Sequence, residues 1–193
     1  LGSAVWTASA VNLYHLWPLD LRTTLFSCGV VVVIMNTVLI RQVNWSRIIG
    51  NLLLTLPFSY LIQCFTALIQ ITGIEMLSLG WRILIDILGI LCVALATSIY
   101  QRANLILHPN DDLMQIIRFR YVHGNATIAQ MVHYIPPVII MVGTYLVSGQ
   151  LWAVNIGTLI CLFFQGTFIG FFDRYAFRNL KHYGIRSKSI TEH

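Results

Sequence analysis

The sequence predicts an all-α integral membrane protein with about six transmembrane helices. Hydrophobic residues make up 57% of the 193 residues and charged residues only 10%, whereas a soluble domain carries roughly 25% charged residues. Apolar runs close to the roughly 20 residues that a helix needs to cross the hydrocarbon core recur along the whole chain. Lipid is therefore expected to cover much of the surface of this protein.

Six apolar segments are predicted to span the membrane as helices, because backbone groups in lipid must be satisfied within their own segment. They are residues 1–15, 22–41, 48–72, 82–101, 128–148 and 153–173. The run Val30–Ile34 does not alternate as a β-barrel strand would. The chain begins at Leu1 without methionine, so we expect the first segment to be the end of a longer helix, with a removed signal peptide as an alternative.

The basic residues predict the orientation. Ten of the twelve follow the second, fourth and sixth segments, and only Arg22 and Arg82 lie on the other side. The positive-inside rule then places both termini, including a basic tail over 174–193, in the cytoplasm. This placement also argues against nucleic acid as a partner despite the net charge of +5. The expected aromatic anchors at the span ends are Trp17, Trp45, Trp81 and Trp152.

The two halves of the chain share short motifs in the same order. The matches are Leu16-x-Pro18-x-Asp20 with Leu107-x-Pro109-x-Asp111, and Trp45-x-x-x-Ile49-Gly50 with Trp152-x-x-x-Ile156-Gly157. They predict one transmembrane domain, 1–173, built from two three-helix repeats of about 1–80 and 81–173. An odd number of spans inverts the second repeat, an arrangement typical of transporters. Asp20 and Asp111 would then form gates at opposite faces, or else simple helix-ending turns.

Polar residues inside the spans are the remaining functional signal, because they usually face a bundle interior or a cavity. No catalytic motif, metal-ligand spacing or cofactor-binding motif occurs, so we expect neither an enzyme nor a bound metal or cofactor. Asp86 is expected to pair with Arg82 one helical turn earlier. The candidate substrate-binding residues are Asp20, Tyr60, Gln63, Asp111, Gln130, His133 and Gln165, although neutral polar residues in spans are more often contacts between helices.

Two further features bear on function. Pro57 and the pair Pro136-Pro137 interrupt predicted spans, and discontinuous helices can expose backbone groups to a solute or only bend for packing. Residues 110–121 are predicted to form a short amphipathic helix on the inner face of the membrane. Its Arg118 and Arg120 would contact lipid headgroups or dock a partner.

Three motifs resemble the YczE/YyaS/YitT-type bacterial multi-pass membrane proteins. They are Pro18-Leu19-Asp20, the run Leu107–Met114, and Ile156-Gly157-Thr158-Leu159, and the likeness extends over nearly the whole chain. The resemblance implies a multi-pass protein of the bacterial cytoplasmic membrane, for which transport is the usual expectation.

Three functions stay open at the level of the sequence. The first is a small-molecule transporter, acting on a solute or a vitamin-like compound. The second is the substrate-binding S component of an energy-coupling-factor vitamin importer, in which Ala4 and Ala8 would form a small-residue stripe that docks the coupling and ATPase subunits. The third is a non-transport membrane partner protein. The chain could act alone or as a homo-oligomer in the lipid bilayer.

Overall fold

A computed structural model describes residues 2–103, 106–177 and 179–180, and these contain helices and no strand. The α-helices are α1 (Val5–Leu16), α2 (Leu21–Ile40), α3 (Trp45–Ile71), α4 (Leu79–Ala103), α5 (Pro109–Ile116), α6 (Ala126–His133), α7 (Ile135–Ser148) and α8 (Ile156–Tyr175). A 3-10 turn, η1 (Ile74–Met76), precedes α4, and a π-helical turn, η2 (Ile117–Tyr121), extends α5. The prediction of an all-α protein is confirmed.

Five helical stretches are long and apolar enough to cross a membrane. They are α2, α3, α4, α6 together with α7 (Ala126–Ser148), and α8. Helix α1 has only 12 residues, and it begins at Val5 rather than continuing a longer helix. It buries the polar Asn12, whose amide group exchanges hydrogen bonds of 2.6 and 2.9 Å with the backbone of Trp152. The described helices therefore give five candidate spans where the sequence predicted six.

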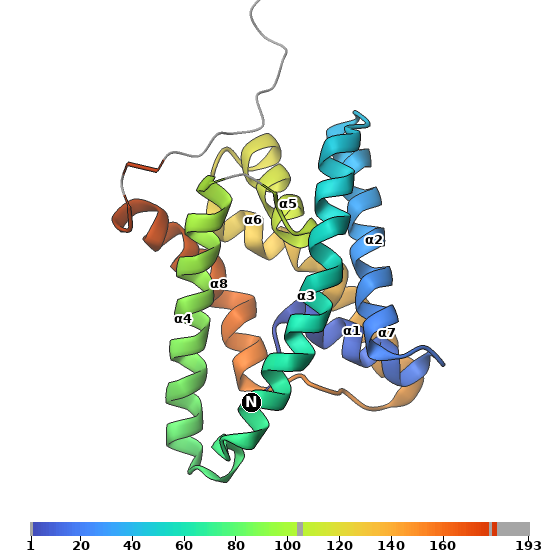
Figure 1. The fold of residues 1–193 in the computed structure, drawn as a ribbon, viewed down its shortest axis with the longest axis vertical. Helices are drawn as coiled ribbons and strands as arrows, with labels where there is room; N and C mark the ends of the chain where they lie inside the picture. The colour runs from blue at the N-terminus through green and yellow to red at the C-terminus, as the bar shows by residue number, and fades with distance from the viewer. Residues whose placement is uncertain (1, 104–105, 178, 181–193) are drawn as a thin grey trace, which may run out of the picture.

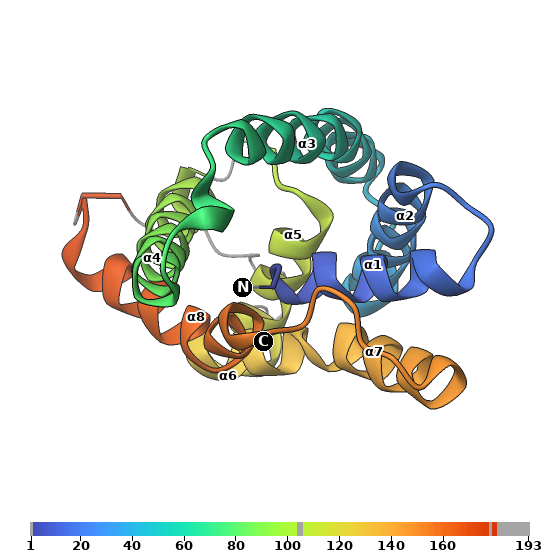
Figure 2. The same ribbon diagram turned by 90° about the horizontal axis from the view of Figure 1, so that it is seen from below.

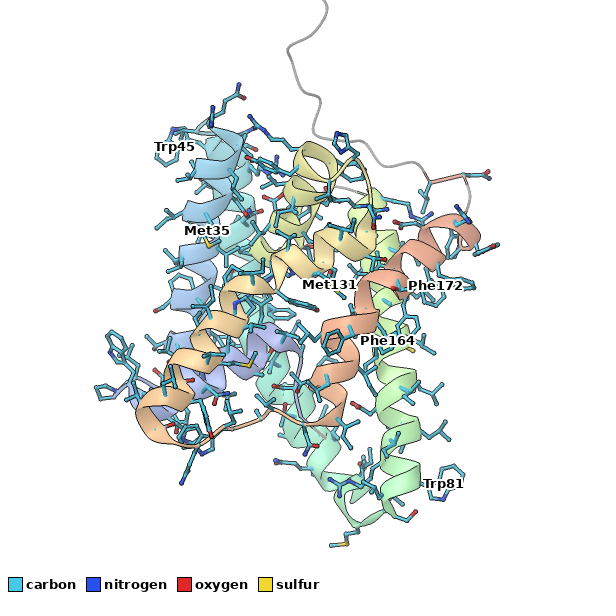
Figure 3. The ribbon with its side chains drawn as sticks, turned by 180° about the vertical axis from the view of Figure 1, so that it is seen from behind. Met35, Trp45, Trp81, Met131, Phe164 and Phe172 are labelled. Atoms are coloured by element: carbon cyan, nitrogen blue, oxygen red, sulfur yellow. The ribbon has the colours of Figure 1, made fainter. Side chains whose placement is uncertain are left out.

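The ends of the candidate spans lie at two opposite ends of the molecule. The α2–α3 turn and the ends of α4 and α8 lie toward one end of the molecule, and the η1 turn and the α7–α8 connection lie at the other (Figure 1). Trp45 and Trp81 mark these opposite ends and are 69% and 61% exposed (Figure 3). Ser3 lies at the end away from the α2–α3 turn, since its N–H donates to the Ala153 carbonyl at 2.9 Å, whereas α8 ends toward that turn (Figure 1). The described residues therefore do not agree with the prediction that both termini lie on the same side.

Helix α5 does not lie on the surface. Seen along the spans, the other helices form a ring around it (Figure 2). Most of its residues are buried, and it packs chiefly against α2 and also against α3, α4 and α6. This corrects the prediction of an amphipathic helix on the inner face, because the polar side of α5 is satisfied by neighbouring helices rather than by water. In the part of the chain that the structure describes, the second half has five α-helices against three in the first, and the inverted repeat stays a prediction.

The interior is close-packed where α6 crosses α8. The core around this crossing includes Leu113, Met114, Ala129 and Ile169. A Cβ atom on Gly166 would lie 2.7 Å from the Gln130 Cβ and 2.9 Å from the Ala126 carbonyl oxygen. These are backbone or near-backbone atoms that cannot rotate away. Glycine is therefore required at position 166 for the two helices to approach.

Gly166→Ala is expected to lower the free energy of unfolding by about 1–3 kcal/mol, because the added methyl group forces α6 and α8 apart. Gly143→Ala is the matched control, since nothing lies within 4 Å of its added Cβ. Removing a glycine from a helix favours folding by roughly 0.5–1 kcal/mol, so this control should be neutral or more stable than wild type. Unfolding by sodium dodecyl sulfate would measure both. Equal stability of the two variants would contradict the close crossing.

Candidate functional site

The start of α5 lies deep between the spans. The His108 ring, directly before α5, contacts the Phe58 ring with their centroids 4.5 Å apart. Phe58 is near the midpoint of the 27-residue α3, and is therefore about 20 Å along that helix from either end. His108 therefore lies at the depth of the middle of α3, and α5 runs from there toward the basic end (Figure 1).

Local interactions hold the start of α5 in place. The His108 N–H donates to the Tyr100 hydroxyl of α4, and the Asn36 side chain of α2 donates to the Pro109 carbonyl at 2.9 Å. Proline is favoured in the first helical turn because it has no N–H to satisfy there. Asp111 and Asp112 in that turn suit the positive end of the helix dipole. The sequence thus starts a helix at the point where the chain reaches the centre.

A buried ion pair ties α5 to α3. Asp112 is fully buried and accepts hydrogen bonds from both the Nε and the Nη2 of Arg47, the former at 2.7 Å. The Asn51 amide adds a bond of 2.8 Å, and the Asn36 amide lies 3.5 Å from the same carboxylate. Helices α2, α3 and α5 therefore converge on one carboxylate.

A cavity of about 540 Å³ borders this network. Its walls are the first turns of α3, with Ser46, Arg47 and Asn51, the segment Ile106–Leu107, and Asp112 of α5. The volume lies within the range of roughly 300–1,000 Å³ that small-molecule sites occupy. Polar and apolar residues contribute to its lining in similar numbers.

A cluster of titratable side chains lies around the start of α5. The Trp6 indole donates to the His133 Nε2 at 2.8 Å, and the Gln130 amide lies 3.5 Å from the His133 Nδ1. The His133 ring is within reach of the Asn110 backbone. The Asp111 carboxyl interacts electrostatically with the phenol groups of Tyr100 and Tyr134. Helices α1, α4, α6 and α7 thus all contribute to this cluster.

Two groups of the cluster titrate away from their ordinary range. Burial lowers the pKa of His108 to about 4, so its imidazole is neutral at physiological pH. Burial, with the negative charge of Asp112 as a second cause, raises the pKa of Asp111 to about 7. Asp111 can therefore exchange a proton near neutral pH. Among the described residues, no group of three His, Cys, Asp or Glu is arranged to hold a metal ion.

The structure brings together only some of the substrate-binding residues predicted from sequence. Asp111, Gln130 and His133 meet at the start of α5. Gln165 is buried in α8, and the side chain of Gln63 lies outside the described residues.

Asp20 and Tyr60 lie away from this cluster. Asp20 is exposed and caps α2, accepting from the Thr23 N–H at 3.4 Å, so it forms the simple helix-ending turn. Tyr60 is 60% exposed, and its ring lies 5.2 Å from the Arg22 guanidinium. Neither residue faces the site.

The residues predicted to bind partners are mostly engaged within the chain. Ala4 is exposed, but Ala8 is fully buried in the core, so the two do not form a surface stripe. Arg118 is buried and donates to Asp173 at 2.6 Å and to the Gly124 carbonyl at 2.8 Å. Arg120 is exposed and donates to the Ile40 carbonyl at the end of α2. Ala8 and Arg118 are corrected on this basis, because buried side chains cannot dock a partner.

The expected pair of Arg82 with Asp86 is also absent from the ion pairs of the described residues. The Asp86 carboxylate instead lies against Gly157, where a Cβ atom would collide with it. Gly157 is in the first turn of α8, whose positive dipole end favours a carboxylate.

The ion pair between Arg47 and Asp112 was not anticipated from the sequence. Arg47 appeared there as an orientation signal and Asp112 as a helix-capping charge. The two residues are 65 positions apart. If residues 110–121 are buried, the charge of Asp112 needs a basic partner on another helix. That requirement is the signal that could have pointed to the ion pair.

Comparison with known proteins gives one family. The model of a family of unknown function, DUF6198, matches residues 1–174, from before α1 to near the end of α8. No curated protein and no solved structure matches the chain. The resemblance to the YczE/YyaS/YitT-type proteins stays a prediction.

Proposed function

The chain belongs to DUF6198, a family of unknown function, and we propose that it is a small-molecule transporter of the bacterial cytoplasmic membrane. The proposed solute site is the cavity beside Arg47 and Asp112, at the side of α5. The observation that carries this proposal is the insertion of α5 into the ring of spans. We place the basic ends of the spans on the cytoplasmic side, following the positive-inside rule.

An inserted half-helix supports transport for a physical reason. Backbone that does not span the membrane is tolerated at that depth only where protein covers it or where it lines an aqueous cavity. Helix ends placed near the midplane supply polar groups to solutes in many transporters. Here the start of α5 has the depth of the middle of α3, and Asp112 borders the cavity.

The lining favours a small polar solute. Arg47 and Asn51 carry donors, while the Asn51 carbonyl and Asp112 carry acceptors. Arg47 and Asp112 both line the cavity, and of the two side chains Asp112 is the buried one. We infer that this pair separates the cavity from the interior of the bundle in this conformation and exchanges partners when the solute passes.

The S-component alternative receives less support. Docking to a coupling protein through Ala4 and Ala8 needs both on one exposed face, and Ala8 is 0% exposed. The partner-protein alternative rested on the amphipathic helix over 110–121 and on the basic tail. Helix α5 lies inside the bundle, and residues 178 and 181–193 of the tail lie outside the described residues.

Filling the cavity is expected to abolish solute binding. Ser46 lines it at the first turn of α3, and Ser46→Trp would occupy its volume. In wild type, a solute at about 100 times its Kd stabilises the protein by roughly 2.7 kcal/mol. A screen of polar metabolites against the unfolding temperature of the purified chain should find such solutes. Ser46→Trp should weaken their binding at least about tenfold.

Val43→Trp is the matched control, because Val43 is 63% exposed and does not line the cavity. It should bind as wild type does. A solute found in this way is then tested for entry into liposomes that contain the protein. The transporter proposal fails if no metabolite stabilises wild type, or if Ser46→Trp and Val43→Trp bind equally well.

A further inference from the structure

We propose that Asp111 is a proton-binding site, and that its proton is coupled to solute binding beside α5. The coupling rests on the proposed transport function. The proton site itself does not, because it depends only on the surroundings of this carboxyl.

Among residues 2–103, 106–177 and 179–180, Asp111 belongs to no ion pair. The ion pairs of the described residues join Arg47 to Asp112, and Arg102 and Arg118 to Asp173. Asp112, the next residue in the chain, holds the Arg47 guanidinium through two hydrogen bonds. The negative charge of Asp112 disfavours ionisation of the neighbouring Asp111 carboxyl.

The other titratable groups around Asp111 bring no positive charge. The His133 Nε2 accepts the Trp6 N–H, and the His108 Nδ1 accepts the Asn110 N–H at 3.4 Å. A ring nitrogen that accepts a hydrogen bond is unprotonated, so both imidazoles are neutral in this arrangement. The remaining titratable groups facing Asp111 are the phenols of Tyr100 on α4 and Tyr134 at the start of α7.

An independent observation also points to a proton-carrying group. Asn36 is 3% exposed, and its amide nitrogen donates into the first turn of α5, to the Pro109 carbonyl. Its Oδ1 is buried with no hydrogen-bond partner, and so is the Oδ1 of Asn110 beside Asp111. Two buried acceptors at one helix end call for a donor. A protonated carboxyl, or water carrying its proton, supplies one.

The exchange is simple to write. Above its midpoint, the Oδ–H bond of the Asp111 carboxyl breaks, the proton passes to water, and a carboxylate remains. Burial and the neighbouring Asp112 raise the pKa of Asp111 to about 7, so the carboxyl is protonated below neutral pH and ionised above it. Acidic residues within membrane proteins commonly serve as proton relays.

Infrared difference spectroscopy of the purified full chain tests the proton site. Between about pH 5 and pH 9, wild type should show a protonated-carboxyl C=O band that is lost with a midpoint near 7. Asp111→Asn should lack the band and Asp111→Glu should retain one. The exposed cap variant Asp20→Asn should titrate as wild type does. The site is overturned if wild type shows no such band or if Asp111→Asn keeps it.

Repeating the polar metabolite screen at about pH 6 and pH 8 tests the coupling. In wild type, the affinity for the solute should differ between pH 6 and pH 8 by up to about tenfold per pH unit, which is the limit for coupling to one proton. In Asp111→Asn, the affinity should be the same at both pH values. If the carboxyl band titrates but metabolite binding does not depend on pH, the coupling is overturned and the proton site stands. A titrating band with no stabilising metabolite overturns the transporter proposal, and with it the coupling, while the proton site stands.

Discussion

Arg47→Met is expected to lower the free energy of unfolding by about 3 kcal/mol. The substitution leaves the Asp112 carboxylate buried with only amide donors from Asn51 and Asn36. Removing one partner of a buried ion pair costs about 3–5 kcal/mol. We expect the lower end of that range because the Arg47 side chain is 26% exposed. Unfolding by sodium dodecyl sulfate measures the loss.

A second substitution identifies the cause. Adding Asp112→Asn to Arg47→Met removes the uncompensated charge, and most of the lost stability should return. Arg41→Met is the control, because Arg41 is exposed and belongs to none of the ion pairs of the described residues. It should change the stability by less than about 0.5 kcal/mol. A double variant less stable than Arg47→Met would show that the pair does not join α5 to α3.

The spans could be predicted because hydropathy is a local property of the sequence. The segment predicted over 22–41 is α2, Leu21–Ile40, and 153–173 corresponds to α8, Ile156–Tyr175. The break at Pro136-Pro137 is also present, since α6 ends at His133 and α7 begins at Ile135. Pro57, in contrast, stays inside one continuous helix.

The placement of α5 could not be predicted in the same way. Its hydrophobic periodicity is that of any helix with one apolar side, and such a helix can lie on a membrane or inside a protein. What decides between them is the set of partners for its polar side, Arg47 and Asn51 on α3 and Asn36 on α2. These contacts join residues more than 60 positions apart and depend on the tertiary arrangement.

Only part of the candidate site could be predicted, because the sequence identifies polar residues in the spans but not their positions in the bundle. Gln130 and His133 were selected because polar groups in a span need partners, and both find them near α5. Asp20 was selected by its motif match with Asp111, yet it is exposed and caps a helix. A short repeated motif predicts a similar local turn, but it does not predict where that turn lies in the bundle.

The second large effect concerns the network that holds the end of α8. The Arg102 side chain is 1% exposed. Its Nη1 donates to the carbonyls of Ala176 at 2.8 Å and Phe177 at 3.0 Å, and its Nε lies 3.7 Å from Asp173. A cation at the C-terminal end of a helix also interacts favourably with the helix dipole. One buried guanidinium therefore satisfies two carbonyl oxygens and lies beside a carboxylate, in part-buried contacts at the end of α8.

Arg102→Met is expected to cost roughly 3 kcal/mol, because the carbonyls of Ala176 and Phe177 lose a charged donor and hydrogen bonds to charged groups are worth about 1.5–3 kcal/mol each. Arg118 still pairs with Asp173 at 2.6 Å, so the loss should come mainly from the unsatisfied carbonyls and α8 should fray from Ala176 backward. Arg120→Met is the matched control. Arg120 also donates to a carbonyl at a helix end, that of Ile40 at 2.7 Å, but it is exposed and water can replace it. Hydrogen exchange of the last turn of α8, with unfolding by sodium dodecyl sulfate, separates the two. Equal losses from Arg102→Met and Arg120→Met would mean that burial does not determine the strength of this helix cap.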